Sequence, residues 1–310
     1  MSKIQKAMHY LLHKPSEIIA YIFMKIAFFL PDRIYLGILF RLKMGQRLDL
    51  DNPKTFNQKL QWLKLYDRYP EHTNMVDKYE AKGIAAKIIG EDHIIPTYGV
   101  WSRFEDIDFD KLPEQFVLKA TNGGGNRDVI ICKDKSTFDY RKAESTLKRA
   151  LSDNTIYRNF REWPYKNIKP RIIAEKYMSD GSGELKDYKF YCFNGEPKSV
   201  LIVNGRTSSE GMTYDYFDMD FIRFPYRTKG AKSSSKQISK PNSFEQMLQF
   251  ARLLSNNTIH VRVDLYNVDG IVYFGEWTFY DSSGYDKFIP DKWDGIVGSW
   301  MKLPKYKKEI

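Results

Sequence analysis

Polar and apolar residues alternate along two neighbouring segments near the C-terminal end of the chain. Residues 260–267 (HVRVDLYN) and 271–280 (IVYFGEWTFY) follow the period of two that is typical of half-buried strands. Between them, residues 268–270 (VDG) fit a three-residue hairpin loop, because glycine readily adopts the positive φ that such a loop requires. The pattern predicts an antiparallel hairpin in which residue 264 pairs with residue 274.

One face of this predicted hairpin carries charged and hydroxyl side chains. Arg262 and Asp264 share that face on the first strand, and Glu276 and Thr278 reach it from the second. A carboxylate that points into the protein loses its hydration and therefore needs a compensating positive charge. Mg²⁺ supplies it, because this ion prefers oxygen ligands and is held by one or two carboxylates together with substrate phosphates. The simpler alternative is an ion pair between Arg262 and Asp264 on a solvated sheet face.

The rest of the chain mixes helical and strand patterns. Thr55 and Gln58 form a capping-box pattern ahead of apolar residues at helical spacing, which predicts a helix over residues 56–66. Residues 75–90, closed by Gly90, predict a second helix. Further helices are expected over residues 138–152 and 243–257. Strands are expected after residue 96 and over residues 115–119, 129–132, 170–178, 185–193 and 198–204.

A glycine-rich turn follows the strand that ends at Lys119. Gly123, Gly124 and Gly125 allow backbone N–H groups to approach a phosphate without interference from Cβ atoms. No Gly-Lys-Ser/Thr follows, so the turn is not a Walker A loop. Three glycines in a hairpin are usually a simple turn, but the lysine at the strand end favours a lid over phosphates.

The first fifty residues are basic and contain the apolar stretch Ile18 to Leu30. Thirteen residues with Lys25 in the middle are too few to span a bilayer. A small-residue cleavage site does not follow, which argues against a secretory signal. Two interpretations stay open: a buried helix, or a basic apolar element lying on the inner membrane surface.

Composition sets outer limits on function. A chain of 310 residues can hold two or three packed subdomains. The net charge of +10 fits an anionic small substrate or an anionic membrane, and no nucleic-acid recognition motif is present, so no nucleic acid is expected as a partner. Cys132 and Cys192 lie in apolar strand-like runs and are expected to be reduced core residues of a cytoplasmic protein.

The order of these parts resembles the ATP-grasp superfamily: a strand ending in lysine, a glycine hairpin, a strand ending in glutamate, an acid on the ribose side, and RxD and ExT on paired strands. Within it, KTFNQKLQWLKL, VDKYEAKGIAAK, FVLKATNGGG, PRIIAEKYM and DYKFYCFNGEP, together with the hairpin, resemble the TupA-like branch. Members of that branch are found among bacterial teichuronopeptide, capsule and surface-polysaccharide functions. The resemblance covers residues 51–289.

The resemblance implies an α+β ATP-grasp fold, in which two α/β subdomains grip a nucleotide next to a helical N-terminal region. The expected parts are a basic apolar helical region (1–50), an N-terminal helical domain (51–110), a subdomain with the glycine hairpin (111–170), a catalytic subdomain (171–300) and a basic tail (301–310).

It also implies roles for individual residues. Lys119 would contact the nucleotide phosphates under the hairpin of Gly123, Gly124 and Gly125, and Arg262 would stabilise the transferring phosphoryl group. Asp264 and Glu276 would hold Mg²⁺, with Thr278 where many relatives have Asn. The remaining nucleotide contacts would come from Glu175 and the backbone of Lys176, Tyr177 and Met178 at the adenine, Asp187 at the ribose, and Lys189 in the same cleft. Asn122 stands where many relatives have His.

The implied activity is an ATP-dependent carboxylate–amine ligase that works through an acyl phosphate. ATP and Mg²⁺ would be its cofactors, and it would attach an amine or amino acid to a uronic-acid sugar of an anionic or lipid-linked glycan. The main alternative is a glycosyltransferase, because Asp218 and Asp220 form a DxD pair that could hold a cation under a sugar nucleotide. A non-enzymatic assembly factor at the membrane is a third interpretation.

Overall fold

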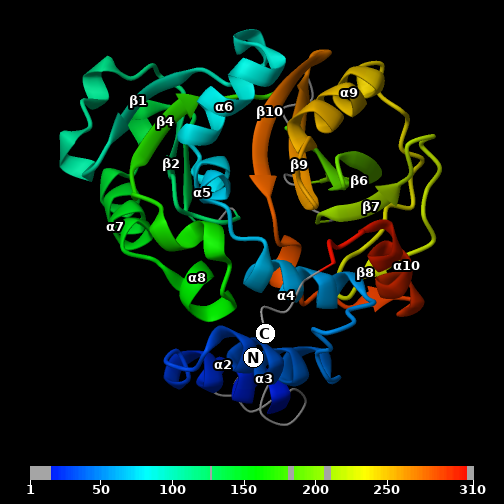
Figure 1. Cartoon of the computed structure of the whole chain (residues 1–310). Helices are drawn as coiled ribbons and strands as arrows, with labels where there is room; N and C mark the ends of the chain where they lie inside the picture. The colour runs from blue at the N-terminus through cyan, green and yellow to red at the C-terminus, as the bar shows by residue number, and fades with distance from the viewer. Residues whose placement is uncertain (1–14, 126–127, 181–184, 206–210, 306–310) are drawn as a thin grey trace.

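Two antiparallel sheets form the body of the protein (Figure 1). The computed structural model describes residues 15–125, 128–180, 185–205 and 211–305. A four-stranded sheet has the order β1-β4-β2-β3, and a five-stranded sheet has the order β10-β9-β5-β6-β7. The strands of the smaller sheet are β1 (Thr97–Trp101), β2 (Phe116–Ala120), β3 (Val129–Cys132) and β4 (Ile172–Lys176). Those of the larger sheet are β5 (Lys186–Phe193), β6 (Glu196–Asn204), β7 (Thr213–Phe217), β9 (His260–Val268) and β10 (Ile271–Thr278).

Helices cover the sheets and connect them. The helix α9 packs on β5, β6 and β9 through an apolar face, and α7 packs on β2. A short strand pair, β8 (Arg227–Thr228) with β11 (Phe288–Ile289), lies beside the C-terminal helix. The helices are α2 (Pro15–Ile26), α3 (Asp32–Met44), α4 (Phe56–Tyr66), α5 (Pro70–Val76), α6 (Glu80–Ile89), α7 (Tyr140–Leu151), α8 (Thr155–Phe160), α9 (Phe244–Ser255) and α10 (Lys292–Trp300).

The predicted helix over residues 56–66 is confirmed, including its capping box at Thr55 and Gln58. The single helix predicted over residues 75–90 is wrong, because the chain breaks between α5 and α6. The break has a local cause: the Asp77 carboxylate accepts hydrogen bonds from the backbone N–H groups of Tyr79 and Glu80, at 2.8 and 3.0 Å, and so favours a new helix start. Lys78 lies inside this break, between Asp77 and Tyr79.

The C-terminal hairpin forms as predicted, but its register differs. Its loop has two residues, Asp269 and Gly270, both with positive φ, instead of three. That loop alone would place Gly275 opposite Asp264 and turn Glu276 to the other face. A β-bulge at Gly275 adds one residue to β10, so that Glu276 pairs directly with Asp264. The predicted pairing of residue 264 with residue 274 is therefore wrong, although the shared face is correct.

The smaller sheet combines strands from both sides of the predicted boundaries at residues 110 and 170, which stay a prediction. Its strand β1 comes from the segment assigned to the N-terminal helical domain, and β4 comes from the segment assigned to the catalytic subdomain. Both pair within one sheet, β1 with β4 and β4 with β2. The two sheets have separate apolar cores, so the sheets themselves mark the two structural units.

The helices α2 and α3 pack against each other at the N-terminal end of the described chain (Figure 1). Within the stretch Ile18 to Leu30 only Ala20, Met24 and Ala27 are buried, whereas Phe29 is 74% exposed and Ile26 is 63% exposed. The interpretation as a buried helix is therefore wrong for most of this stretch. In the described part of the chain, no helix has the length and apolar character needed to cross a membrane. The basic residues before residue 15 and after residue 305 lie outside the described chain.

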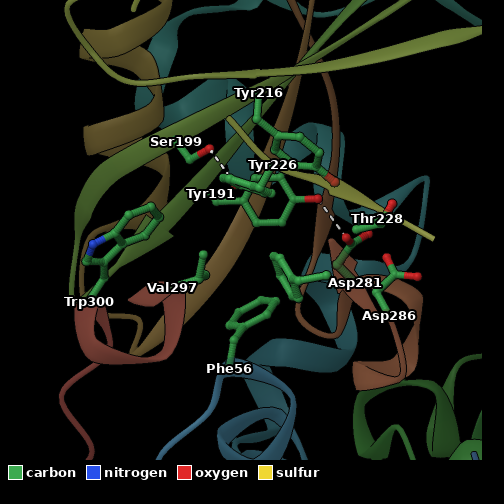
Figure 2. Close-up of a pocket in the computed structure, with 11 residues that line it drawn as sticks. Phe56, Tyr191, Ser199, Tyr216, Tyr226, Thr228, Asp281, Asp286, Val297 and Trp300 are labelled. Atoms are coloured by element: carbon green, nitrogen blue, oxygen red, sulfur yellow. Dashed lines mark hydrogen bonds between the residues drawn. The ribbon is translucent and has the colours of Figure 1, made fainter. Parts of the chain in front are cut away.

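Aromatic side chains fill the space between the five-stranded sheet and the C-terminal segment (Figure 2). Tyr226 stacks on Trp293, with ring centroids 4.6 Å apart, and also packs against Phe288. A cavity of about 10 Å³ stays between these rings and the sheet. Asp281 lines one end of it, at the point where the chain leaves β10.

Candidate active site

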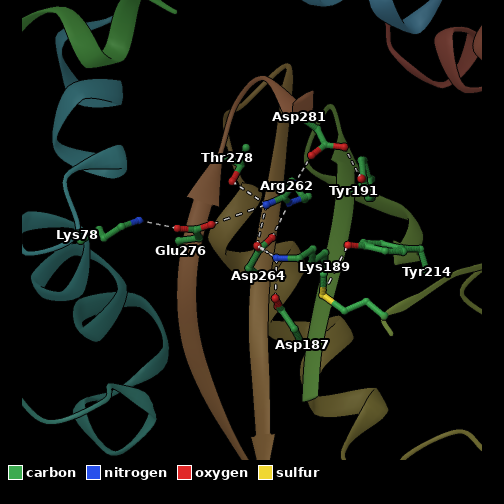
Figure 3. A network of polar contacts seen from close by, with 11 residues as sticks. Lys78, Asp187, Lys189, Tyr191, Tyr214, Arg262, Asp264, Glu276, Thr278 and Asp281 are labelled. Atoms are coloured by element: carbon green, nitrogen blue, oxygen red, sulfur yellow. Dashed lines mark hydrogen bonds and ion pairs between the residues drawn. The ribbon is translucent and has the colours of Figure 1, made fainter. Parts of the chain in front are cut away.

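Arg262 lies at the centre of a polar network on one face of the five-stranded sheet (Figure 3). Its guanidinium donates two hydrogen bonds to Asp264, at 2.7 and 2.8 Å, and one to the hydroxyl of Thr278 at 3.1 Å. It also donates to Asp281 and lies 3.8 Å from Glu276. Burial lowers the pKa of a guanidinium, but Asp264 and Asp281 hold the pKa of Arg262 well above its usual value. Arg262 is therefore a permanent cation in a fixed orientation.

Lys189 extends this network along β5. Its ammonium group donates to Asp264 and lies 2.7 Å from Asp187. Burial acts to lower the pKa of Lys189, and the carboxylates of Asp264 and Asp187 outweigh it, so the pKa is raised. The Asp187 carboxylate is almost fully buried, and its partner Lys189 gives it a role that the sequence did not indicate. Its predicted contact with a ribose stays a prediction.

Glu276 is the carboxylate of this face that is most open to solvent, with a side chain 33% exposed. Lys78, in the break between α5 and α6, donates to Glu276 at 2.7 Å from outside the sheet (Figure 3). The backbone N–H of Lys78 donates to the carbonyl of Thr121, just after β2, at 3.1 Å. Despite burial, Lys78, Lys189 and Arg262 hold the pKa of Glu276 well below its usual value. The helix break thus joins the two sheets at the carboxylate pair.

A second cluster lies on the smaller sheet. Glu175 of β4 accepts from Lys82 of α6 at 2.5 Å and pairs with Lys119 of β2 at 2.6 Å. Burial acts to raise the pKa of Glu175, but Lys119 and Lys82 together lower it to about 2. The side chain of Glu175 therefore holds two lysines in place, and its predicted contact with the adenine stays a prediction.

The glycine turn is anchored from behind by Asn122. The side-chain amide of Asn122 donates to the carbonyls of Ala150 and Asp153, both at 3.0 Å, and so joins the turn to the end of α7. Gly123 donates to the carbonyl of Ala120 at 3.3 Å, and Gly125 has a positive φ of 70° that favours glycine. Gly124 lies against Ile156 of α8. Residues 126 and 127, which complete the predicted lid, lie outside the described chain.

The segment expected to face an adenine follows β4. The backbone N–H of Lys176 donates to the carbonyl of Pro96 at 2.9 Å, so this group already has a partner within the protein. Tyr177 lies beyond the strand end, where its ring faces Lys133. An adenine contact would therefore depend on the Lys176 carbonyl and on the backbone of Tyr177 and Met178.

The DxD pair lies at the end of β7. Asp218 accepts hydrogen bonds from the backbone N–H groups of Asp220 and Ile222, at 3.0 and 2.7 Å. Such bonds are typical of an Asx turn. The turn accounts for the carboxylate of Asp218 without a bound cation.

The hairpin fits the predicted Mg²⁺ ion in donor type. Asp264 and Glu276 are directly opposed on paired strands and supply two carboxylates, while phosphates usually complete the shell of such an ion. Among the described residues, no group of three or more His, Cys, Asp or Glu side chains is arranged to hold a metal ion alone. The site would therefore bind a metal together with an anionic ligand.

The sequence did not identify Lys78, Lys82 or Asp281 as site residues. The two lysines are four residues apart, with Lys78 just before α6 and Lys82 in its first turn, and this spacing is common on solvated helices. Asp281 follows the hairpin directly and bonds both Arg262 and the hydroxyl of Tyr191. Its position shortly after the strand that carries Glu276 is the sequence feature that could have identified Asp281 as a site residue.

Residues 58–302 match the family described as TupA-like ATPgrasp. The chain belongs to that family. This membership confirms the resemblance seen in the sequence and the expected ATP-grasp fold class. A comparison with curated protein sequences gives no significant match.

Solved structures similar to this ATP-grasp chain include two D-alanine–D-alanine ligases. The ligase from Bacillus anthracis complexed with ATP is 17% identical with a TM-score of 0.39, over 66% of this chain and 54% of that one. The ligase from Helicobacter pylori is 14% identical with a TM-score of 0.46, over 82% of this chain and 68% of that one. An L-amino acid ligase from Bacillus licheniformis is 12% identical with a TM-score of 0.46, over 84% of this chain and 59% of that one. The chain thus spans little more than half the length of several of these proteins.

Proposed function

We propose that this chain is an ATP-dependent carboxylate–amine ligase that acts on a cell-surface polysaccharide. The observation that carries the proposal is the direct opposition of Asp264 and Glu276 on one sheet face, with Arg262 beside them and Lys78 reaching across from the helix break. Phosphoryl transfer needs positioning and fixed positive charge more than covalent chemistry, and this face supplies both.

The proposed reaction has two steps. A carboxylate oxygen of the acceptor attacks the terminal phosphorus of ATP, and ADP leaves. An amine then attacks the acyl carbon, inorganic phosphate leaves, and the amine loses a proton. Arg262 would face the transferring phosphoryl group, and Lys119 and Lys82 would face the other phosphates under the glycine turn. Mg²⁺, held by Asp264 and Glu276, would neutralise charge on phosphate oxygens.

The test is ATP turnover with a uronic acid as the probe for the carboxylate substrate. Galacturonate with an amino acid should stimulate release of ADP and phosphate, and hydroxylamine should trap an acyl hydroxamate in place of the amide. D264N and E276Q should each abolish release. D218N is the matched control, because an asparagine side-chain oxygen can still accept the two turn hydrogen bonds. Consumption of a sugar nucleotide without ATP, lost in D218N, would instead establish the transferase.

We also propose that α2 and the turn after it rest on an anionic membrane surface. Ile19, Ile22, Ile26, Phe28 and Phe29 are each at least half exposed within eleven residues. A water-soluble surface rarely groups such side chains without a partner. Lys25, Arg33 and Arg41 are exposed on α2 and α3, which pack together, and this combination of apolar and basic groups matches the headgroup region of anionic lipids.

Sedimentation with vesicles tests this contact. Vesicles containing phosphatidylglycerol should bind the protein, and pure phosphatidylcholine vesicles should bind it less. I22S/F29S should release it. I131S/I222S removes two equally exposed apolar side chains elsewhere and should bind as the wild type does. Equal binding by both double variants would show that α2 is not the contact.

A further inference from the structure

A strongly basic segment crosses the surface beside the five-stranded sheet. No acidic residue lies between Phe221 and Phe244, whereas this stretch holds Arg223, Arg227, Lys229, Lys232, Lys236 and Lys240. The backbone N–H of Lys229 donates to the carbonyl of Lys287, so two exposed lysines lie close together just beyond the paired strands β8 and β11. Like charges in such positions are destabilising on their own. Their grouping indicates an anionic partner.

The segment forms a groove of about 350 Å³, a size within the range of small-ligand sites. Arg223, Phe224, Tyr226, Arg227, Ser233 and Ile289 line it. The β8–β11 pair contributes Arg227 and Ile289, which are direct partners in the register. Part of the groove therefore rests on two hydrogen-bonded strands.

Both arginines are held in place by the protein. Arg223 donates through Nη2 to the buried carboxylate of Asp215 and to the carbonyl of Ser234. Arg227 donates through Nη1 to the carbonyl of Ala231 at 3.3 Å. In the described part of the chain these bonds occupy one nitrogen of each guanidinium, so N–H groups of both are available to a ligand. A planar guanidinium suits a carboxylate, which it can bind through two parallel hydrogen bonds.

The groove adjoins the candidate active site through Tyr226. This residue lines both the groove and the small cavity that Asp281 borders, and Asp281 bonds Arg262 (Figure 2). The cavity has room for no more than one water molecule, so a polymer would stay in the groove. Tyr226 is buried and stacks on Trp293, so its ring offers little surface for the base stacking that single-stranded nucleic acids use.

We propose that this groove binds an acidic glycan, a chain of carboxylate-bearing sugars. The proposal rests on the ligase function, and it assigns the acceptor a binding site apart from the reacting atoms. Binding in the groove would keep the acceptor chain on the protein while another of its sugars reacts.

The experiment measures binding of a galacturonic acid hexamer in the absence of ATP, with maltohexaose as a neutral chain of equal length. The wild type should bind the acidic hexamer at least about ten-fold more tightly, and R227Q/K229Q/K232Q should weaken that binding about ten-fold. The matched control, K87Q/R141Q/K142Q, removes the same charge from exposed positions on α6 and α7 and should bind as the wild type does.

Three outcomes would overturn the proposal: equal affinity for the two hexamers, unchanged binding in the groove variant, or equal loss in the control variant. Tighter binding of a single-stranded oligonucleotide or of anionic vesicles through the same three residues would also overturn it. D264N should keep full affinity for the acidic hexamer. ADP release by the wild type is measured separately, with ATP, an amino acid and the hexamer. If D264N binds the hexamer but the wild type releases no ADP in that assay, the ligase function fails while the glycan site stands.

Discussion

Glu276 lies directly opposite Asp264 because β10 carries one extra residue, Gly275, in the segment that pairs with β9. The two-residue turn at Asp269 and Gly270 sets one register, and the bulge at Gly275 shifts it by one position before Glu276 is reached. Both carboxylates therefore depend on the smallest residue of the hairpin for their shared face.

Gly275→Ala should separate the carboxylates. A Cβ atom there would lie 2.9 Å from the Asp264 carbonyl oxygen and 2.9 Å from the Tyr266 ring, and backbone on one side cannot move freely. We expect a loss of about 1–3 kcal/mol in stability and at least a ten-fold loss in Mg·ATP affinity. Gly83→Ala is the control: nothing lies within 4 Å of its Cβ, and α6 should gain slightly in stability. Unchanged ATP affinity in the Gly275 variant would contradict this role.

Lys78→Met should weaken nucleotide binding at least ten-fold. The lysine is the cation that bonds Glu276 from outside the sheet, and its loss should let the pKa of Glu276 rise toward the usual value. Because the Glu276 side chain is one-third exposed, stability should fall by less than about 1 kcal/mol. Calorimetric titration with ATP measures the affinity. Lys87→Met, at an exposed position on α6, should leave the affinity unchanged.

Glu175→Gln should destabilise the protein in a pH-dependent way. The pKa of Glu175 is about 2 when folded, against 4.5 for the free side chain, so its contribution is present above pH 4.5 and is lost as the pH falls toward 2. The difference corresponds to about 3 kcal/mol near neutral pH. Urea unfolding of both proteins from pH 7 to pH 3 should show the gap closing below pH 4.5. A gap that is constant over this range would contradict the assigned ion pairs.

Asp281→Asn should lower the rate of ADP release about ten-fold and change ATP affinity less than three-fold. Asp281 fixes the end of Arg262 that is not held by Asp264, so its loss should disorder the guanidinium during phosphoryl transfer. Asp286→Asn is the control, because this residue lines the same cavity. A fall in affinity alone, with an unchanged rate, would show that Asp281 acts on binding and not on the transfer step.

The sequence predicted local features well and tertiary contacts poorly. The capping box at Thr55 and the strand around Asp264 depend only on residues that are close together in the sequence, and both appear in the structure. The bulge at Gly275 was not predicted. A glycine within a strand pattern can mark a bulge, but it does not show which of the two paired strands carries the extra residue. The pairing of Lys82 with Glu175 joins residues 93 positions apart, and no local pattern carries that information.

The broken helix was not predicted for a different reason, because its signal was local. Residues 75–90 have helical spacing throughout, and the interruption depends on Asp77, which Arg171 holds at 3.1 Å from a distant part of the chain. An aspartate three residues before Glu80 was a start signal that the longer pattern concealed.

Each of five cations assigned to the candidate active site already has a carboxylate partner: Lys78, Lys82, Lys119, Lys189 and Arg262. An incoming triphosphate must therefore exchange with these carboxylates instead of meeting bare positive charge. Its affinity is the difference between two sets of ion pairs, and added salt weakens both sets together. The binding constant for ATP should accordingly vary less with ionic strength than five unpaired cations would suggest.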